Sequence, residues 1–247
     1  MTESSPQAAL ARYARLLHAR GWVANHDGNA TVRLGTNRFL ITPTAISKRL
    51  IEESMLVIVD GEGRKISGRM RAFSEQGLHH TVYGARPDVG AVLHAHPPHA
   101  TGFALAHRVL FSPPTSPEPV VSLGPDIPLI PYARPGAASE AALRPFAYTH
   151  NAVLLGNHGV MTWGPDLETA YLRMELVEQI AQTTLIAEQL GGARPIPAQD
   201  VEFLEGKRQT AGLAPPGAPS DEDDAELVGA IGREVARVLG RGSFDGP

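Results

Sequence analysis

Apolar residues recur at helical spacing near the start of the chain. Between residues 5 and 20 they fall on one face of a helix, and Gly21 follows as a stop signal. We therefore expect an opening amphipathic helix. Its buried face is predicted to consist of Leu10, Tyr13, Ala14 and Leu17.

Short runs rich in β-branched residues follow this helix. They cover residues 30–34, 38–41 and 55–59, and turn-forming Gly, Asn and Asp residues separate them. This pattern predicts the antiparallel strands of a sheet.

Helical and strand-like segments then alternate. Ser74 is placed to cap a helix that runs to about Gly84, and the apolar residues 91–96 read as a strand. A further helix is expected after Pro97 and Pro98, because proline is tolerated in a first helical turn.

Prolines are frequent between residues 111 and 135, which predicts an ordered loop with a strand at 127–130. Residues 137–148 have a helical pattern. The apolar residues 152–163 resemble two strands joined by a turn at residues 156–159, which places His158 at that turn.

A long helix is predicted from Pro165 to about Leu190, capped by Asp166. Its apolar stripe is expected to run through Leu172, Leu176, Ile180 and Leu185. Beyond it the chain is first rich in Ala, Pro and Gly and then acidic, and only residues 225–239 are again expected to be helical. We therefore divide the chain into a domain at 1–192 and a tail or packing arm at 193–247.

Composition narrows the possible functions. The chain has 247 residues, 43% of them hydrophobic, which is ample for a core. It has no cysteine, so disulfides, thiolate metal sites and iron–sulfur clusters are excluded, and any metal must use His, Asp or Glu. A net charge of −4 with scattered Lys and Arg does not favour a nucleic-acid partner. The sequence shows neither a signal peptide nor an apolar run long enough to span a membrane, so a soluble cytoplasmic protein is expected.

Two histidines mark a candidate metal site. His94 and His96 are two residues apart in the predicted strand, so their side chains leave the same face and can share one ion. A catalytic zinc takes three protein ligands and leaves a fourth position for water or substrate. An H-x-H pair also arises by chance in a chain with ten histidines. His79 is one helical turn after Glu75, so it can either support the metal site or have a purely structural role.

Five motifs in order resemble the class II aldolase/adducin family, which includes the fuculose-1-phosphate and rhamnulose-1-phosphate aldolases and the ribulose-5-phosphate 4-epimerase. The similarity covers roughly residues 10–190. The motifs are Gly28-Asn29 before a strand, Ile-Thr-Pro-Thr at 41–44, Ser74-Glu75, the His94-Ala95-His96 triplet, and Asn157-His158-Gly159.

The resemblance implies an α/β fold, an α/β/α sandwich with a central, largely antiparallel sheet, assembled as a homotetramer with sites at subunit interfaces. It implies that His94, His96 and His158 bind the metal and that Glu75 is the catalytic acid/base. Gly28, Asn29, Thr44 and Ser74 are implied to bind the substrate. Zinc is the preferred ion, although manganese, cobalt or iron suit the same ligands.

This sequence departs from the family pattern at two phosphate anchors. The family's Gly after the Thr of the Ile-Thr-Pro-Thr motif is Ala45 here, which makes a left-handed backbone costlier. The first Ser of its Ser-Ser pair is Phe73, which removes a hydroxyl and is expected to add apolar bulk at the anion site. Lys48 and Arg71 remain near in sequence. We therefore expect a hydroxy-oxo compound or oxo-acid that need not be phosphorylated.

The interfacial tyrosine that donates a proton in many of these aldolases has no counterpart in residues 111–119. Tyr132 is the nearest candidate, with a packing role as its alternative, and the tail is another source of a donor. The resemblance favours a lyase of carbohydrate metabolism that performs retro-aldol cleavage through a metal-stabilised enediolate. A decarboxylase of a hydroxylated aromatic or oxo-acid, a sugar-phosphate 4-epimerase and a non-catalytic adducin-like module are the alternatives.

Overall fold

The protein is built around one mixed sheet. The structure, a computed structural model, describes residues 5–217. Within them the sheet has eight strands in the order β4-β3-β2-β1-β5-β8-β7-β6, and every neighbouring pair is antiparallel except β6 and β7. The strands are β1 (Asn29–Gly35), β2 (Arg38–Ile41), β3 (Val57–Val59), β4 (Lys65–Ser67), β5 (Ala91–Ala95), β6 (Leu129–Ile130), β7 (Ala152–Leu155) and β8 (Gly159–Gly164).

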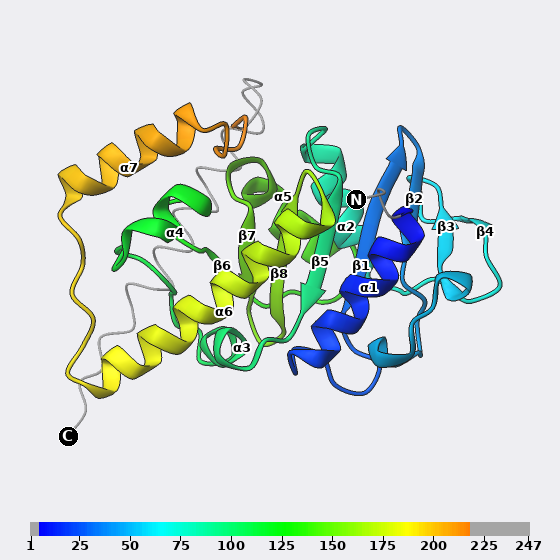
Figure 1. Ribbon diagram of the computed structural model, residues 1–247, viewed down its shortest axis with the longest axis horizontal. Helices are drawn as coiled ribbons and strands as arrows, with labels where there is room; N and C mark the ends of the chain where they lie inside the picture. Colours follow the sequence, from blue (N-terminus) through cyan, green and yellow to red (C-terminus); the bar gives the residue numbers. More distant parts are fainter. Residues whose placement is uncertain (1–4, 218–247) are drawn as a thin grey trace.

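Helices cover both faces of this sheet (Figure 1). α1, α3 and α6 lie on one face and α2 and α5 on the other, while α4 and α7 lie together beyond the β6 edge. The helices are α1 (Pro6–Ala19), α2 (Gln76–Ala85), α3 (Pro98–Leu105), α4 (Pro117–Ser122), α5 (Ala137–Thr149), α6 (Leu167–Gln189) and α7 (Ala198–Thr210). Two short 3-10 helices occupy Lys48–Leu50 and Glu53–Met55.

Each face of the sheet has its own hydrophobic core. One core joins α1, α3 and α6 to the sheet, and includes Leu17, Leu93 and Met174. The other joins α2 and α5 to the opposite face, and includes Val82 and Trp163. The predicted α/β/α sandwich is therefore confirmed.

The pattern of the first helix was interpreted correctly. Ser5 caps α1 by accepting a hydrogen bond from the backbone N–H of Ala8, and Gly21 follows the helix with a φ of +73°. The four residues of the predicted stripe are all buried.

Other parts of the structure differ from the sequence pattern. The stripe predicted for α6 was right for Ile180, which is buried, and for Leu176, which packs against the core. It was wrong for Leu172, which is 51% exposed, and for Leu185, which is 42% exposed, because the buried face also contains Tyr171, Met174 and Val177. The proline-rich segment contains α4, which begins at Pro117 where proline loses no hydrogen bond. The strand β4 and the helix α7 were not predicted.

The arm predicted from residue 193 is described only as far as residue 217, and its helix expected at 225–239 lies outside the described residues. The described part includes α7, whose Arg208 donates to the carbonyl of Leu123 next to α4. No helix among residues 5–217 is long and apolar enough to cross a membrane.

Candidate metal centre

His94 lies on β5, one of the central strands, and is buried. Its Nδ1 lies 2.9 Å from the backbone carbonyl of Val160 on the neighbouring strand β8. The carbonyl can only accept, so Nδ1 carries the hydrogen and Nε2 is left with a free lone pair. Burial, reinforced by His158 and His96, holds the pKa of His94 well below its usual value. The ring is therefore neutral, which is the form that binds metals.

His96 follows directly after the end of β5. Its backbone N–H donates to the carbonyl of Trp22 at 2.8 Å, and this bond fixes the chain where it leaves the sheet. Its Nε2 lies 3.1 Å from Nε2 of His94. Burial lowers the pKa of His96 as well.

His158 comes from the turn between β7 and β8, 62 residues after His96 in the numbering. The turn constrains two of its residues. Asn157 adopts the left-handed backbone conformation, with a φ of +59°. At Gly159 there is no room for a side chain, since a Cβ would lie 2.6 Å from Cδ2 of His96. Asn157 is held in turn by His107 and by the carbonyl of Ala104 at the end of α3. Glycine is required here because the His96 ring fills the space of a side chain.

The three imidazoles meet at one point. One nitrogen from each of His94, His96 and His158 lies within 4.8 Å of the others, and within residues 5–217 no other group of His and acidic side chains does the same. Two ligands of a tetrahedral zinc, with bonds of 2.0–2.1 Å, are about 3.3 Å apart. The 3.1 Å between the Nε2 atoms of His94 and His96 is close to this spacing. Three imidazole nitrogens at this spacing fit a divalent transition metal.

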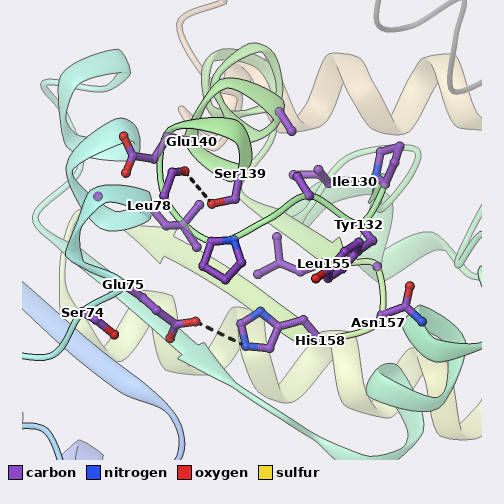
Figure 2. A pocket seen from close by; sticks show the side chains of 17 residues that line it. Ser74, Glu75, Leu78, Ile130, Tyr132, Ser139, Glu140, Leu155, Asn157 and His158 are labelled. Carbon is purple, nitrogen blue, oxygen red and sulfur yellow. Dashed lines mark hydrogen bonds and ion pairs between the residues drawn. The ribbon is translucent and has the colours of Figure 1, made fainter.

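Glu75 lies beside this group. It is the residue that directly precedes α2 and is therefore the N-cap. The sequence predicted Ser74 at this position, which was wrong. No side chain accepts a capping hydrogen bond from the helix. Oε1 of Glu75 lies 3.5 Å from Nε2 of His158, and the Glu75 side chain is 29% exposed. Figure 2 shows the carboxylate and the His158 ring pointing toward one another. Glu75 is thus near enough to exchange protons with a molecule bound at the imidazoles.

Asn29 fixes the other oxygen of this carboxylate. It pairs with His94 in the register of β1 and β5, and its Nδ2 lies 3.0 Å from Oε2 of Glu75. Its Oδ1 faces Nε2 of His79 at 2.6 Å. His79 is buried on α2 and its two ring nitrogens face Thr31 and Asn29, which fits the supporting role considered for it.

A pocket of about 290 Å³ opens beside Glu75 and His158. Tyr132 lines it from the segment after β6 and is 62% exposed, so it is not the packing tyrosine considered as an alternative. Figure 2 shows Tyr132 and Asn157 on the same side of the pocket as His158. The charged residues that line the pocket are both acidic, Glu75 and Glu140.

The other predicted substrate-binding residues lie around the same centre. Ser74 is exposed and lines the pocket, and Gly28 approaches His94 so closely that a Cβ would lie 3.0 Å from its carbonyl oxygen. The backbone N–H of Thr44 donates to the carbonyl of Arg71, which brings the Thr44 loop against the segment before Ser74.

The family departures have a different effect from the one expected. Phe73 does not add bulk to the pocket, because it is 5% exposed and packs into the core under α2. Ala45 does adopt the left-handed backbone, with a φ of +58°, so the loop keeps a glycine-like shape. Lys48 is buried and donates to the carbonyls of His26 and Ile46, so it braces two loops. Burial lowers the pKa of Lys48 to about 8.

Sequence comparison places these residues among known proteins. Residues 8–185 match the family described as the class II aldolase and adducin N-terminal domain. An L-fuculose phosphate aldolase of Methanococcus maripaludis is 30% identical over 179 residues, 72% of this chain and 96% of the relative. A 3-oxo-tetronate 4-phosphate decarboxylase of Haemophilus influenzae is 32% identical over 190 residues, 74% of this chain and 88% of the relative.

Solved structures give the same result. A structure of L-fuculose 1-phosphate aldolase superposes with a TM-score of 0.76 at 26% identity, covering 85% of this chain and 98% of the other. The L-fuculose-1-phosphate aldolase of Thermus thermophilus superposes with a TM-score of 0.65 at 30% identity, covering 77% of this chain and 98% of the other. The similarity therefore spans nearly the whole of each relative.

Proposed function

Since the chain belongs to the class II aldolase and adducin family, we propose that it is a metal-dependent lyase that cleaves the carbon–carbon bond of a hydroxy-oxo compound by retro-aldol chemistry. One observation carries the proposal. Three imidazoles converge on one point, and Oε1 of Glu75 lies 3.5 Å from Nε2 of one of them, beside an open pocket. An adducin-like module without catalysis has no use for this arrangement.

His94, His96 and His158 would hold the metal. When bound there, a divalent ion supplies Lewis acidity that stabilises negative charge on the oxygens of an enediolate, an effect worth several kcal/mol. We propose zinc, because three nitrogen ligands with one open position suit it, with manganese, cobalt and iron as the ions to compare.

Glu75 and Tyr132 would move the protons. Cleavage takes the hydrogen from the hydroxyl oxygen that becomes the aldehyde, and delivers a proton to the carbon that loses its partner. We assign delivery to carbon to Glu75, because Asn29 holds its Oε2 and leaves Oε1 toward His158 and the pocket. Transfer at the hydroxyl oxygen is assigned to Tyr132, whose ring lines the same pocket. General acid–base catalysis of this kind contributes about 10² to 10⁴ in rate.

Gly28, Asn29, Thr44 and Ser74 would bind the end of the substrate where the sugar phosphates of the family carry their phosphate. Backbone and hydroxyl groups in these loops replace the cations that a phosphate site usually has, because Lys48 already donates to two carbonyls. The residue at position 73 offers no hydroxyl. We therefore propose that a carboxylate or an uncharged oxygen suffices there, although the relatives named above act on phosphates by name.

A decarboxylase is the second candidate, and one observation favours it. The relative from Haemophilus influenzae is named a decarboxylase and is as similar to this chain as the aldolases are. Loss of carbon dioxide from an oxo-acid leaves an enolate, which a metal held by the same imidazoles would stabilise and Glu75 would protonate. The 4-epimerase needs a firmly held sugar phosphate and is therefore less favoured.

We further propose that the protein acts in the cytoplasm as a homotetramer with sites at subunit interfaces. The tetramer with interfacial sites comes with the family resemblance. The exposure of Tyr132, at 62%, supports a site that another subunit completes. Light scattering at catalytic concentrations tests the oligomeric state.

A substrate panel tests the proposed function. Hydroxy-ketone phosphates, their unphosphorylated counterparts, free hydroxy-oxo acids and hydroxylated aromatic acids are incubated with the protein loaded with zinc, manganese or cobalt. Aldehyde and carbon dioxide are measured separately. Aldehyde release supports the lyase, whereas carbon dioxide without aldehyde assigns the decarboxylase. A phosphate ester that is turned over far better than its unphosphorylated counterpart contradicts the proposed substrate class.

A further inference from the structure

A chain of hydrogen bonds runs from the core of the protein to Glu75. Tyr83 on α2 lies 2.9 Å from the hydroxyl of Thr31 on β1, and this hydroxyl lies 2.9 Å from Nδ1 of His79. Nε2 of His79 lies 2.6 Å from Oδ1 of Asn29, and Nδ2 of Asn29 lies 3.0 Å from Oε2 of Glu75. Three of these distances are those of ordinary hydrogen bonds, and the one between His79 and Asn29 is slightly shorter.

The carboxylate determines the direction of each bond. An ionised carboxylate only accepts, so Asn29 donates through Nδ2 and presents Oδ1 to His79. His79 must then donate through Nε2, which leaves Nδ1 to accept the hydrogen of Thr31. Thr31 has one hydrogen, so its oxygen accepts from the hydroxyl of Tyr83. All four donors therefore point toward Glu75.

Burial protects this arrangement. Thr31 is 2%, His79 1% and Tyr83 4% exposed, and Asn29 is 5% exposed. The ring of Phe73 lies edge-on against His79 with 5.2 Å between centroids, so the residue that replaces a family serine covers the chain of bonds. Burial also lowers the pKa of His79 to about 3, which keeps it neutral with one donor and one acceptor.

The backbone explains how these residues meet. Asn29 and Thr31 are two apart on β1, so both face α2. His79 and Tyr83 are four apart on α2, so both face β1, and His79 is one turn beyond Glu75. The chain of bonds is thus built into the packing of one helix on one strand.

We propose that Thr31, His79 and Tyr83 are positioning residues that fix the catalytic carboxylate through Asn29, leaving Oε1 of Glu75 directed at the metal site and the pocket. The inference rests on the proposed role of Glu75. It assigns a function to His79 and explains why the polar side chains of Thr31 and His79 are buried between β1 and α2. A carboxylate with one oxygen fixed needs less reorganisation when it exchanges a proton.

Two variants of Thr31 separate this role from a packing role. Thr31→Val keeps the shape of the side chain and removes the hydroxyl, whereas Thr31→Ser keeps the hydroxyl and removes a methyl group. With the best compound of the substrate panel and the metal-loaded protein, Thr31→Val should lower kcat about fivefold or more with KM little changed, since the hydroxyl that bonds both His79 and Tyr83 is lost. Thr31→Ser should stay within about twofold of the wild type. Equal losses in the two variants, or full kcat in Thr31→Val, would overturn the proposal.

An NMR measurement tests the directed chain without any substrate. In protein labelled with ¹⁵N-histidine at pH 7, the signals lost in His79→Gln identify His79. In the wild type as purified, we expect His79 to be the neutral Nε2–H tautomer. The Nδ1–H tautomer or an imidazolium would reverse the bond to Asn29 and overturn the proposal. Because this result does not depend on turnover, a panel in which no compound reacts refutes the proposed function alone.

Discussion

Oε1 of Glu75 lies 3.5 Å from Nε2 of His158, although the two residues are 83 positions apart in the chain. One precedes α2 and the other occupies the turn between β7 and β8. The sheet brings them together with His94 and His96, and the proposed function depends on the proximity of these four side chains.

Glu75→Gln is expected to keep the metal and lose turnover. The amide has nearly the same shape as the carboxylate and none of the three imidazoles is changed, but it cannot carry a proton. We expect kcat to fall by a factor of about 10² or more, with metal content unchanged by elemental analysis. Unimpaired turnover would remove the acid/base assignment.

Tyr132→Phe is expected to lower kcat by a factor of about ten to a hundred, because the pocket loses the hydroxyl assigned to proton transfer at oxygen. Tyr148→Phe is the matched control, since Tyr148 does not line this pocket. Steady-state kinetics of both variants decide the point. Tyr132 has no catalytic role if both variants retain wild-type kcat.

Gly159→Ala is expected to weaken metal binding. The added Cβ would lie 2.6 Å from Cδ2 of His96 and 2.7 Å from the carbonyl of Ala95, so the His96 ring must move. Gly206→Ala on α7 meets nothing within 4 Å and should instead stabilise its helix by about 0.5–1 kcal/mol. Metal titration by calorimetry and thermal unfolding should separate the two. An unchanged metal affinity in Gly159→Ala would show that the His96 ring position is unimportant.

The neutral state of His79 predicts a pH dependence of stability. Its pKa is lowered to about 3, while an unfolded histidine has a pKa near 6.5, so the unfolded chain binds the proton more readily. The stability it contributes is present above pH 6.5 and is lost as the pH falls toward 3. Below pH 6, the free energy of unfolding of the metal-free wild type should fall by about 1.4 kcal/mol more per pH unit than that of His79→Gln. Urea unfolding of both proteins in EDTA at pH 7, 6 and 5 measures this, and equal slopes would mean that His79 is protonated when folded.

Local patterns predicted much of the site. The spacing of His94 and His96 in an apolar strand placed both near one point, and the glycines around His158 placed it on a turn. These inferences succeed because strand alternation and turn chemistry are properties of a few neighbouring residues.

Properties that depend on tertiary packing were not predictable. The buried face of α6 includes the small residues Ala170 and Ala181, whereas Leu172 and Leu185 are exposed. The positions of the leucines therefore did not predict the whole buried face. The sequence predicted that Phe73 adds bulk to the pocket, but the packing of α2 on the sheet buries Phe73 in the core. Likewise, nothing in the sequence says that Thr31 lies beside His79, because only the packing of α2 on β1 brings them together.

The central claim is that three histidines hold one metal ion, and the metal content of the purified protein tests it most directly. Wild type prepared without chelators and His96→Ala are analysed for zinc, manganese, cobalt and iron, with His18→Ala as a control because His18 lies on α1. We predict about one ion per chain in the wild type and in His18→Ala, and almost none in His96→Ala. A wild type that carries no metal and takes up none on titration, or a His96→Ala variant that retains it fully, would contradict the account.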